Sequence, residues 1–76
     1  MKKENKEKLK KAEALIRESV RNIEDVYTDI MNGYLEMSES AQDSERGEKI
    51  NDCFEHLAGV SLELSLNADE IAEYLK

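Results

Sequence analysis

Two ladders of apolar residues, each repeating every seven positions, run through almost the whole chain. The first ladder consists of Leu9, Ile16, Ile23, Ile30 and Met37. The second consists of Ile50, Leu57, Leu64 and Ile71. Each has a companion row four residues further on, made of Val20, Tyr27 and Tyr34 in the first half and of Phe54, Ser61, Ala68 and Leu75 in the second. Because an α-helix turns once in 3.6 residues, these rows predict two long helices, each with a broad apolar face.

The two helices should be joined by a single turn. Residues 38–44 (SESAQDS) are the only cluster of small polar side chains and offer Ser40 or Ser44 as the cap of the next helix. We therefore predict an all-α, antiparallel two-helix hairpin in one domain, residues 1–76, with helices over about 5–36 and 45–75 and a turn over about 38–44. The Asn32-Gly33 dipeptide often marks a turn, but Tyr34 and Met37 keep the ladder in phase, so the first helix is expected to pass through it.

A break in the second helix is the main alternative. Asn67 is followed by Ala68, Asp69 and Glu70, a pattern typical of a helix start, and residues 61–67 alternate as a strand would. Against both, the ladder continues without a change of phase from Leu64 to Ile71 and Leu75. We expect one continuous helix.

At 76 residues the chain is too small to build a large core of its own. Such chains are usually stabilised by disulfides, a structural metal or self-association. One cysteine excludes an internal disulfide, and one histidine argues against a zinc site within one chain. We therefore predict that two hairpins dimerise into a four-helix bundle. Its core should contain Leu9, Ile16, Ile23, Ile30, Ile50, Phe54, Leu57, Leu64, Ile71 and Leu75.

Small side chains also form rows at helical spacing. On the second helix they are Ala58, Ser61, Ser65, Ala68 and Ala72, and on the first helix Ala12, Ser19 and Gly33. Rows of small residues let two helix backbones approach closely. The alternative is that these residues only fill exposed positions. A larger side chain at Ala68 distinguishes the two interpretations, because only a close contact would be forced open.

The charge of the chain is unevenly distributed. Residues 1–11 hold six Lys and two Glu, whereas residues 12–76 hold five Lys or Arg and sixteen Asp or Glu. The acidic body argues against direct binding to nucleic acid or to an anionic membrane. In an antiparallel hairpin, the basic start would lie beside Asp69, Glu70 and Glu73, and we expect these groups to pair. The charged N-terminus does not resemble a signal peptide and no segment is long and apolar enough for a membrane span, so we expect a cytoplasmic protein.

No set of residues points to catalysis or to a cofactor. Cys53 and His56 are three residues apart, so on a helix they share a side, and two chains together could offer a Cys₂His₂ zinc site. With no other Cys or His in the chain, a half-buried cysteine and a polar histidine are the commoner explanation. The three glycines are isolated, so no phosphate-binding loop is present. We expect a protein that is not an enzyme.

Several large side chains lie beside the main ladders. Two Tyr, a Met and a Leu cluster near the turn end of the first helix, and two Leu lie beyond the stripe of the second. They are either a contact surface for a partner or part of a dimer core. This candidate interface consists of Tyr27, Met31, Tyr34, Leu35, Leu62 and Leu66.

These features favour a non-catalytic, homo-oligomeric helical protein that binds and regulates another protein. A second hypothesis is an acidic decoy that occupies the basic site of a nucleic-acid-binding protein, with carboxylates standing in for phosphates. A third is a sponge for a small anion, held at an oligomer interface by Lys10, Lys11 or Arg17. Binding by a decoy should weaken steeply with added salt, whereas apolar docking should hardly change.

Overall fold

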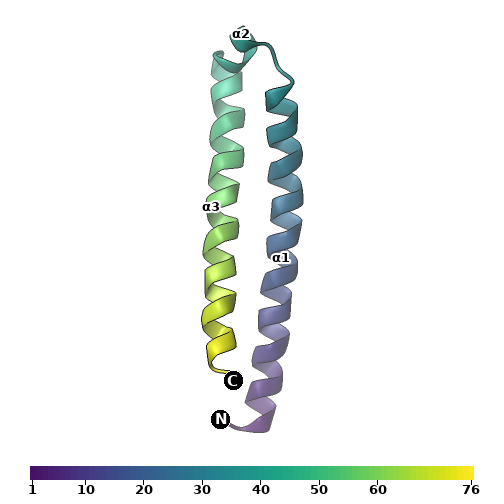
Figure 1. Cartoon of the computed structure of the whole chain (residues 1–76), viewed down its shortest axis with the longest axis vertical. Helices are drawn as coiled ribbons and strands as arrows, with labels where there is room; N and C mark the ends of the chain where they lie inside the picture. Colours follow the sequence, from purple (N-terminus) through teal and green to yellow (C-terminus); the bar gives the residue numbers. More distant parts are fainter.

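The computed structural model describes all 76 residues and confirms an all-helical chain with two long helices and no strand. Helix α1 spans Lys3–Leu35, α2 spans Glu39–Gln42 and α3 spans Glu45–Glu73. The long helices run antiparallel, side by side along a rod of 58 × 15 × 14 Å (Figure 1). Neither of them is apolar over a stretch long enough to cross a bilayer.

The seam between α1 and α3 follows the two ladders. All ten side chains predicted for the core are half-buried. Only four residues of the chain are buried, and their exposed fractions are 0 % for Ala68, 5 % for Ser61 and 7 % for Val20, with Gly47 as the fourth. No large side chain is completely enclosed. A single hairpin therefore has a contact line rather than a closed core.

The connection between the long helices is more ordered than a plain turn. The sequence predicted one turn over about 38–44, and this was incomplete, because Glu39–Gln42 form the short helix α2. Ser38 caps it by accepting a hydrogen bond from the backbone N–H of Ala41 at 3.2 Å. The Gln42 side chain donates to the carbonyl of Tyr34 at 2.9 Å, which ties α2 to the last turn of α1. These local hydrogen bonds hold the connection folded.

The start of α3 distinguishes the two predicted caps. The backbone N–H of Gly47 donates to the Ser44 hydroxyl at 3.1 Å, so Ser44 is the N-cap and Ser40 lies within α2. From there α3 passes without a break through Asn67, as the ladder indicated. Helix α1 likewise passes through Gly33.

We expect Ser44→Ala to lower the free energy of unfolding by about 1 kcal/mol, because an orphan N–H of the first turn loses its acceptor. Urea unfolding followed by circular dichroism measures the difference. Ser40→Ala is the control and should change the stability by less than about 0.5 kcal/mol, because Ser40 is exposed and caps no helix. Equal losses in both variants would contradict the assignment of the cap.

Candidate protein-interaction surface

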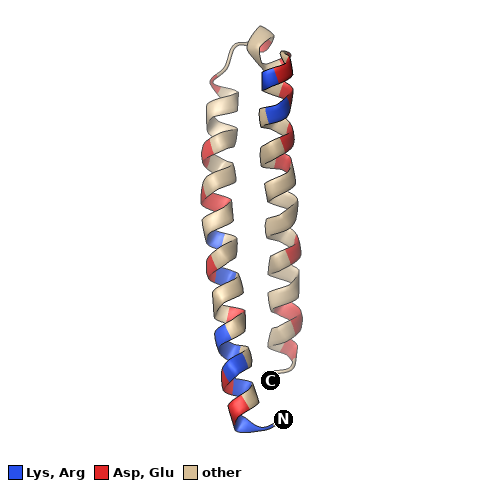
Figure 2. Cartoon of the chain, turned by 180° about the vertical axis from the view of Figure 1, so that it is seen from behind, with Lys and Arg blue, Asp and Glu red and all other residues tan.

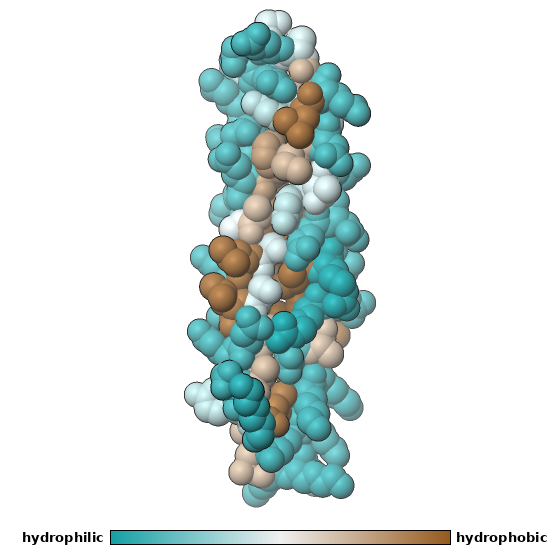
Figure 3. Space-filling view, in the orientation of Figure 1, coloured by the Kyte–Doolittle hydropathy of each residue, from teal (hydrophilic) through white to brown (hydrophobic).

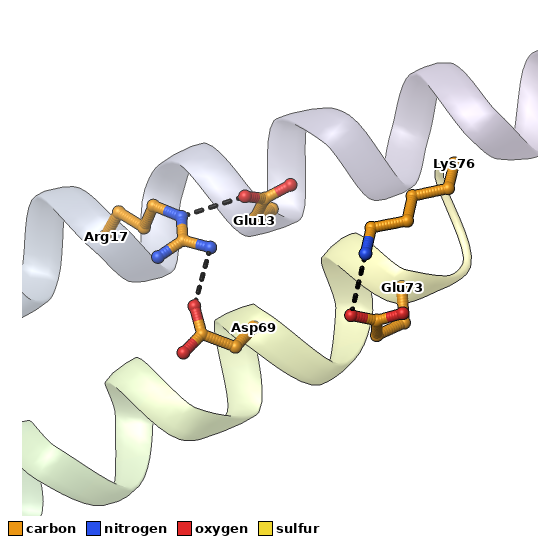
Figure 4. A network of polar contacts seen from close by, with 5 residues as sticks. All are labelled: Glu13, Arg17, Asp69, Glu73 and Lys76. Atoms are coloured by element: carbon orange, nitrogen blue, oxygen red, sulfur yellow. Dashed lines mark hydrogen bonds and ion pairs between the residues drawn. The ribbon is translucent and has the colours of Figure 1, made fainter.

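One ion-pair cluster joins the two long helices and marks one side of the seam. The Arg17 guanidinium donates to Glu13 on the same helix at 2.8 Å and to Asp69 on α3 at 3.1 Å (Figure 4). The hydrogen bond to Glu13 and then that to Asp69 raise the pKa of Arg17 further above its ordinary value. Arg17 therefore keeps its charge throughout the neutral pH range.

The basic start of α1 does not pair with α3 as predicted. No lysine of residues 1–11 lies within 4 Å of a carboxylate, and the four ion pairs of the chain all lie elsewhere. The reason is a difference in length. Asp69 lies level with Arg17, so Glu73, where α3 ends, reaches only about the level of Glu13. The first turns of α1 extend past that end (Figure 1).

We expect Asp69→Asn to lower the free energy of unfolding by no more than about 1 kcal/mol, because an exposed ion pair is weakened by water and salt. The difference between wild type and variant should shrink further at 1 M NaCl, where charges are screened within about 3 Å. Thermal unfolding at 0.05 M and 1 M salt tests this. A loss above 2 kcal/mol at both salt concentrations would mean that Asp69 has a structural role beyond the ion pair.

Helix geometry assigns the flanking residues to two sides of the seam. The ion-pair side is the side of the seam on which Arg17 meets Asp69. Its flanking rows are Lys10, Arg17, Glu24 and Met31 on α1 and Asn51, Ala58, Ser65 and Ala72 on α3. The opposite side is flanked by Ala12, Ser19, Val26 and Gly33 on α1, by Cys53, Val60 and Asn67 on α3, and by Tyr74 directly after the end of α3. None of these last eight residues is charged, and we call their surface the charge-free side. The next residue of the α3 row towards the turn is Arg46, in the first turn of α3 and beyond this surface.

A groove confirms that the charge-free side spans both helices. It has a volume of about 200 Å³ and is lined by Asn22, Ile23 and Val26 from α1 and Leu57 from α3. Val26 is 51 % exposed, although its neighbours in the groove are mostly apolar. A larger groove of about 480 Å³ follows the overhanging start of α1 and is lined by Met1, Asn5, Lys8, Leu9 and Ala12.

The predicted interface residues lie in different environments. Tyr27 and Tyr34 are half-buried in the seam, and the Tyr34 ring packs against Phe54 with centroids 5.5 Å apart and planes tilted by 57°. Met31 is half-buried, while Leu35 near the turn is 63 % exposed. The six residues therefore do not form one continuous cluster.

Leu62 and Leu66 are the exposed part of that set on α3. They are 62 % and 53 % exposed and, four residues apart, they point to the same outer surface of the helix. A hydrophobic cluster stands out on α3 at mid-height of the molecule (Figure 3). By helix phase this pair lies outside the rows of the charge-free side. We call it the leucine pair.

The small residues of α3 differ in burial, since some lie within the seam and others at its edge. Ala68 and Ser61 are buried against α1, and Ala58, Ser65 and Ala72 are half-buried beside them. This favours the close helix contact over the alternative that they fill exposed positions. On α1, by contrast, Ser19 and Gly33 are exposed.

Cys53 and His56 are both exposed on α3. No group of three or more His, Cys, Asp or Glu side chains in one chain is placed to hold a metal ion. A separate polar depression lies on α1. It is lined only by polar residues, which are Glu24, Asp25, Thr28, Asp29 and Asn32.

Two residues that shape this molecule were missed by sequence reasoning. Gln42 holds α2 to α1, and Gly47 packs against the backbone of α2. The sequence signal for Gly47 was a glycine in the first turn of a predicted helix.

The chain matches no family model, no curated protein and no solved structure.

Proposed function

We propose that this is a small, non-catalytic, cytoplasmic helical protein that self-associates and binds another protein, which it regulates. The observation that carries the proposal is the amount of apolar surface that one hairpin leaves in solvent. Apart from Met1, six large apolar or aromatic side chains are more than half exposed, namely Leu15, Val26, Leu35, Leu62, Leu66 and Tyr74. Two of them, Leu62 and Leu66, lie together on one surface of α3, and an exposed apolar patch commonly marks a contact site for another protein.

The excess surface can be estimated. The chain exposes 5843 Å², about 1,100 Å² more than the roughly 4,700 Å² that size scaling gives for a compact monomer of its mass. A standard interface buries about 800 Å² on each partner. Self-association would therefore bring the exposed area per chain to the range of a compact protein.

The molar mass in solution, measured by light scattering after size exclusion at low and high salt, tests the self-association. We expect a dimer or a larger assembly at both salt concentrations, because burial of apolar surface does not depend on charge. A folded monomer at about 100 μM protein would contradict it. Circular dichroism on the same sample separates a folded monomer from an unfolded chain.

The partner site is assigned to the leucine pair, because it lies outside the charge-free side and would stay accessible in a dimer formed there. Immobilised wild type should retain a partner protein from a cell extract at 0.5 M NaCl, and the double variant Leu62→Glu, Leu66→Glu should lose it. A matched control exchanges two exposed residues of α1, Asp25→Asn and Asp29→Asn, and should retain it. Failure of wild type to retain any protein would contradict partner binding.

The acidic decoy is the second candidate, favoured by the exposed carboxylates of α1, among them Glu18, Asp25, Asp29 and Glu36, which have no ion-pair partner. The same experiment distinguishes it. Retention by a decoy would be lost at 0.5 M NaCl and in the Asp25→Asn, Asp29→Asn variant, because both reduce the attraction to a basic groove.

A further inference from the structure

We infer that a second copy of this chain docks on the charge-free side in a head-to-tail orientation, so that the turn of one hairpin lies beside the termini of the other. The inference rests on the proposed self-association and specifies its surface and its geometry. Three observations carry it: the absence of charge along one side of the seam, the area available there and the separation of charge between the two ends of the rod.

The distribution of charge selects the side. When two hairpins stack face to face, the rows that flank the seam become the inner layer of a four-helix bundle. On the ion-pair side this layer would contain Lys10, Arg17 and Glu24, whose transfer from water is costly without new partners. On the charge-free side the same positions carry small, apolar or neutral side chains, and only polar groups that can form hydrogen bonds need to be accommodated.

The exposed apolar residues agree with this choice. Val26 is 51 % and Tyr74 71 % exposed in the single hairpin, and both belong to the charge-free rows. Leu15, 63 % exposed, lies next to the row that contains Ala12 and Ser19. The apolar groove formed by Ile23, Val26 and Leu57 lies on the same side, further towards the turn than Leu15 and Tyr74, and could receive a side chain from the second copy.

The orientation follows from the ends of the rod. Residues 1–17 and 69–76 form the terminal end and together carry eight basic and six acidic side chains, a net charge of +2. Residues 29–58 form the turn end and carry two basic and eight acidic side chains, a net charge of −6. Basic residues are concentrated along the N-terminal part of α1 (Figure 2). A parallel pair would place the two −6 ends together, whereas a head-to-tail pair places each beside a basic end.

The overhang of α1 fits the same arrangement. The groove lined by Met1, Leu9 and Ala12 lies at the overhanging start of α1, and no residue of α3 lines it. In a head-to-tail pair it would face the turn end of the second copy. The lysines of this segment, which make no ion pair in the hairpin, would then approach that copy's carboxylates.

A matched pair of substitutions tests the side. Val26→Glu on the charge-free side should convert the dimer to a monomer at 100 μM protein, whereas Leu62→Glu on the outer surface of α3 should leave the mass unchanged. Both positions are more than half exposed in the hairpin, so neither change should prevent its folding, and circular dichroism verifies this. A dimer that persists with Val26→Glu, or dissociates with Leu62→Glu, would overturn the choice of side while leaving self-association intact. A monomeric wild type would instead contradict self-association itself.

A distance measurement tests the orientation. Glu39→Cys in a Cys53→Ser background places one spin label on α2, at the tip of the rod and away from the proposed interface. In the dimer, a head-to-tail pair should give a label separation of about 50 Å from the rise along the helices, and a parallel pair about 20 Å, one bundle width. Double electron–electron resonance separates these values, and the shorter one would overturn the orientation.

The orientation also bears on the Cys53–His56 pairs. Head-to-tail packing keeps the two pairs of a dimer apart, so an intersubunit zinc site would contradict this packing as well.

Discussion

Gly47→Ala should destabilise the hairpin by about 2 kcal/mol, although alanine is normally the better helix former by about 1 kcal/mol. A Cβ at Gly47 would overlap the backbone carbonyl oxygens of Ala41 and Gln42 at the end of α2. These are backbone atoms, so the clash cannot be relieved by rotating a side chain. Either α2 moves away or the first turn of α3 unwinds, and each response disturbs the hydrogen bond between Gly47 and the Ser44 cap.

The effect is measurable as a fall in melting temperature of about 10 °C, since 1 kcal/mol corresponds to about 4–8 °C for a domain of this size. Gly59→Ala is the matched control. It lies in the same helix with nothing within 4 Å of the added carbon, so it should stabilise α3 by about 0.5–1 kcal/mol. Opposite signs for the two variants are the expected result. A stabilising Gly47→Ala would show that α2 does not pack against α3 in solution.

The contrast between these glycines explains what the sequence could and could not predict about the fold. The long helices were predictable because their ladders span four or five repeats, and Ser44 because a capping residue acts on its own helix. Helix α2 has four residues, fewer than are needed to define a helical period. The requirement for glycine at position 47 arises from α2 lying against it, a tertiary contact that no local pattern records.

The candidate interface was predictable to a similar extent. Apolar residues outside the main stripe identified Leu35, Leu62 and Leu66, which are exposed in the hairpin. Tyr27 and Tyr34 belong to a companion row that faces α3, so they are half-buried within the chain instead. A heptad row predicts that a side chain is covered, but not whether the same chain or another chain covers it. The sequence also does not show which row of α1 lies on the same side of the seam as which row of α3. The ion pair of Arg17 with Asp69 fixes that pairing of rows.

Ala68→Leu should weaken the contact between α1 and α3 directly. Ala68 has no exposed surface, and Val20, about one turn from Arg17, is buried in the same part of the seam. Three additional carbons at this position have no space, so the helices must separate locally or the new side chain must adopt a strained rotamer. Overpacking of this kind typically costs about 1–3 kcal/mol.

We therefore expect the melting temperature to fall by about 10 °C in Ala68→Leu, while helical content at 20 °C is retained. Glu55→Leu provides the comparison at an exposed position on the outer surface of α3, outside the proposed dimer interface, and should change the stability of the hairpin by less than about 0.5 kcal/mol. If both variants unfold at the wild-type temperature, the small residues of α3 are not in close contact with α1. If only Ala68→Leu is destabilised, Ala68 allows the two backbones to approach, and its row has the structural role that its spacing predicted.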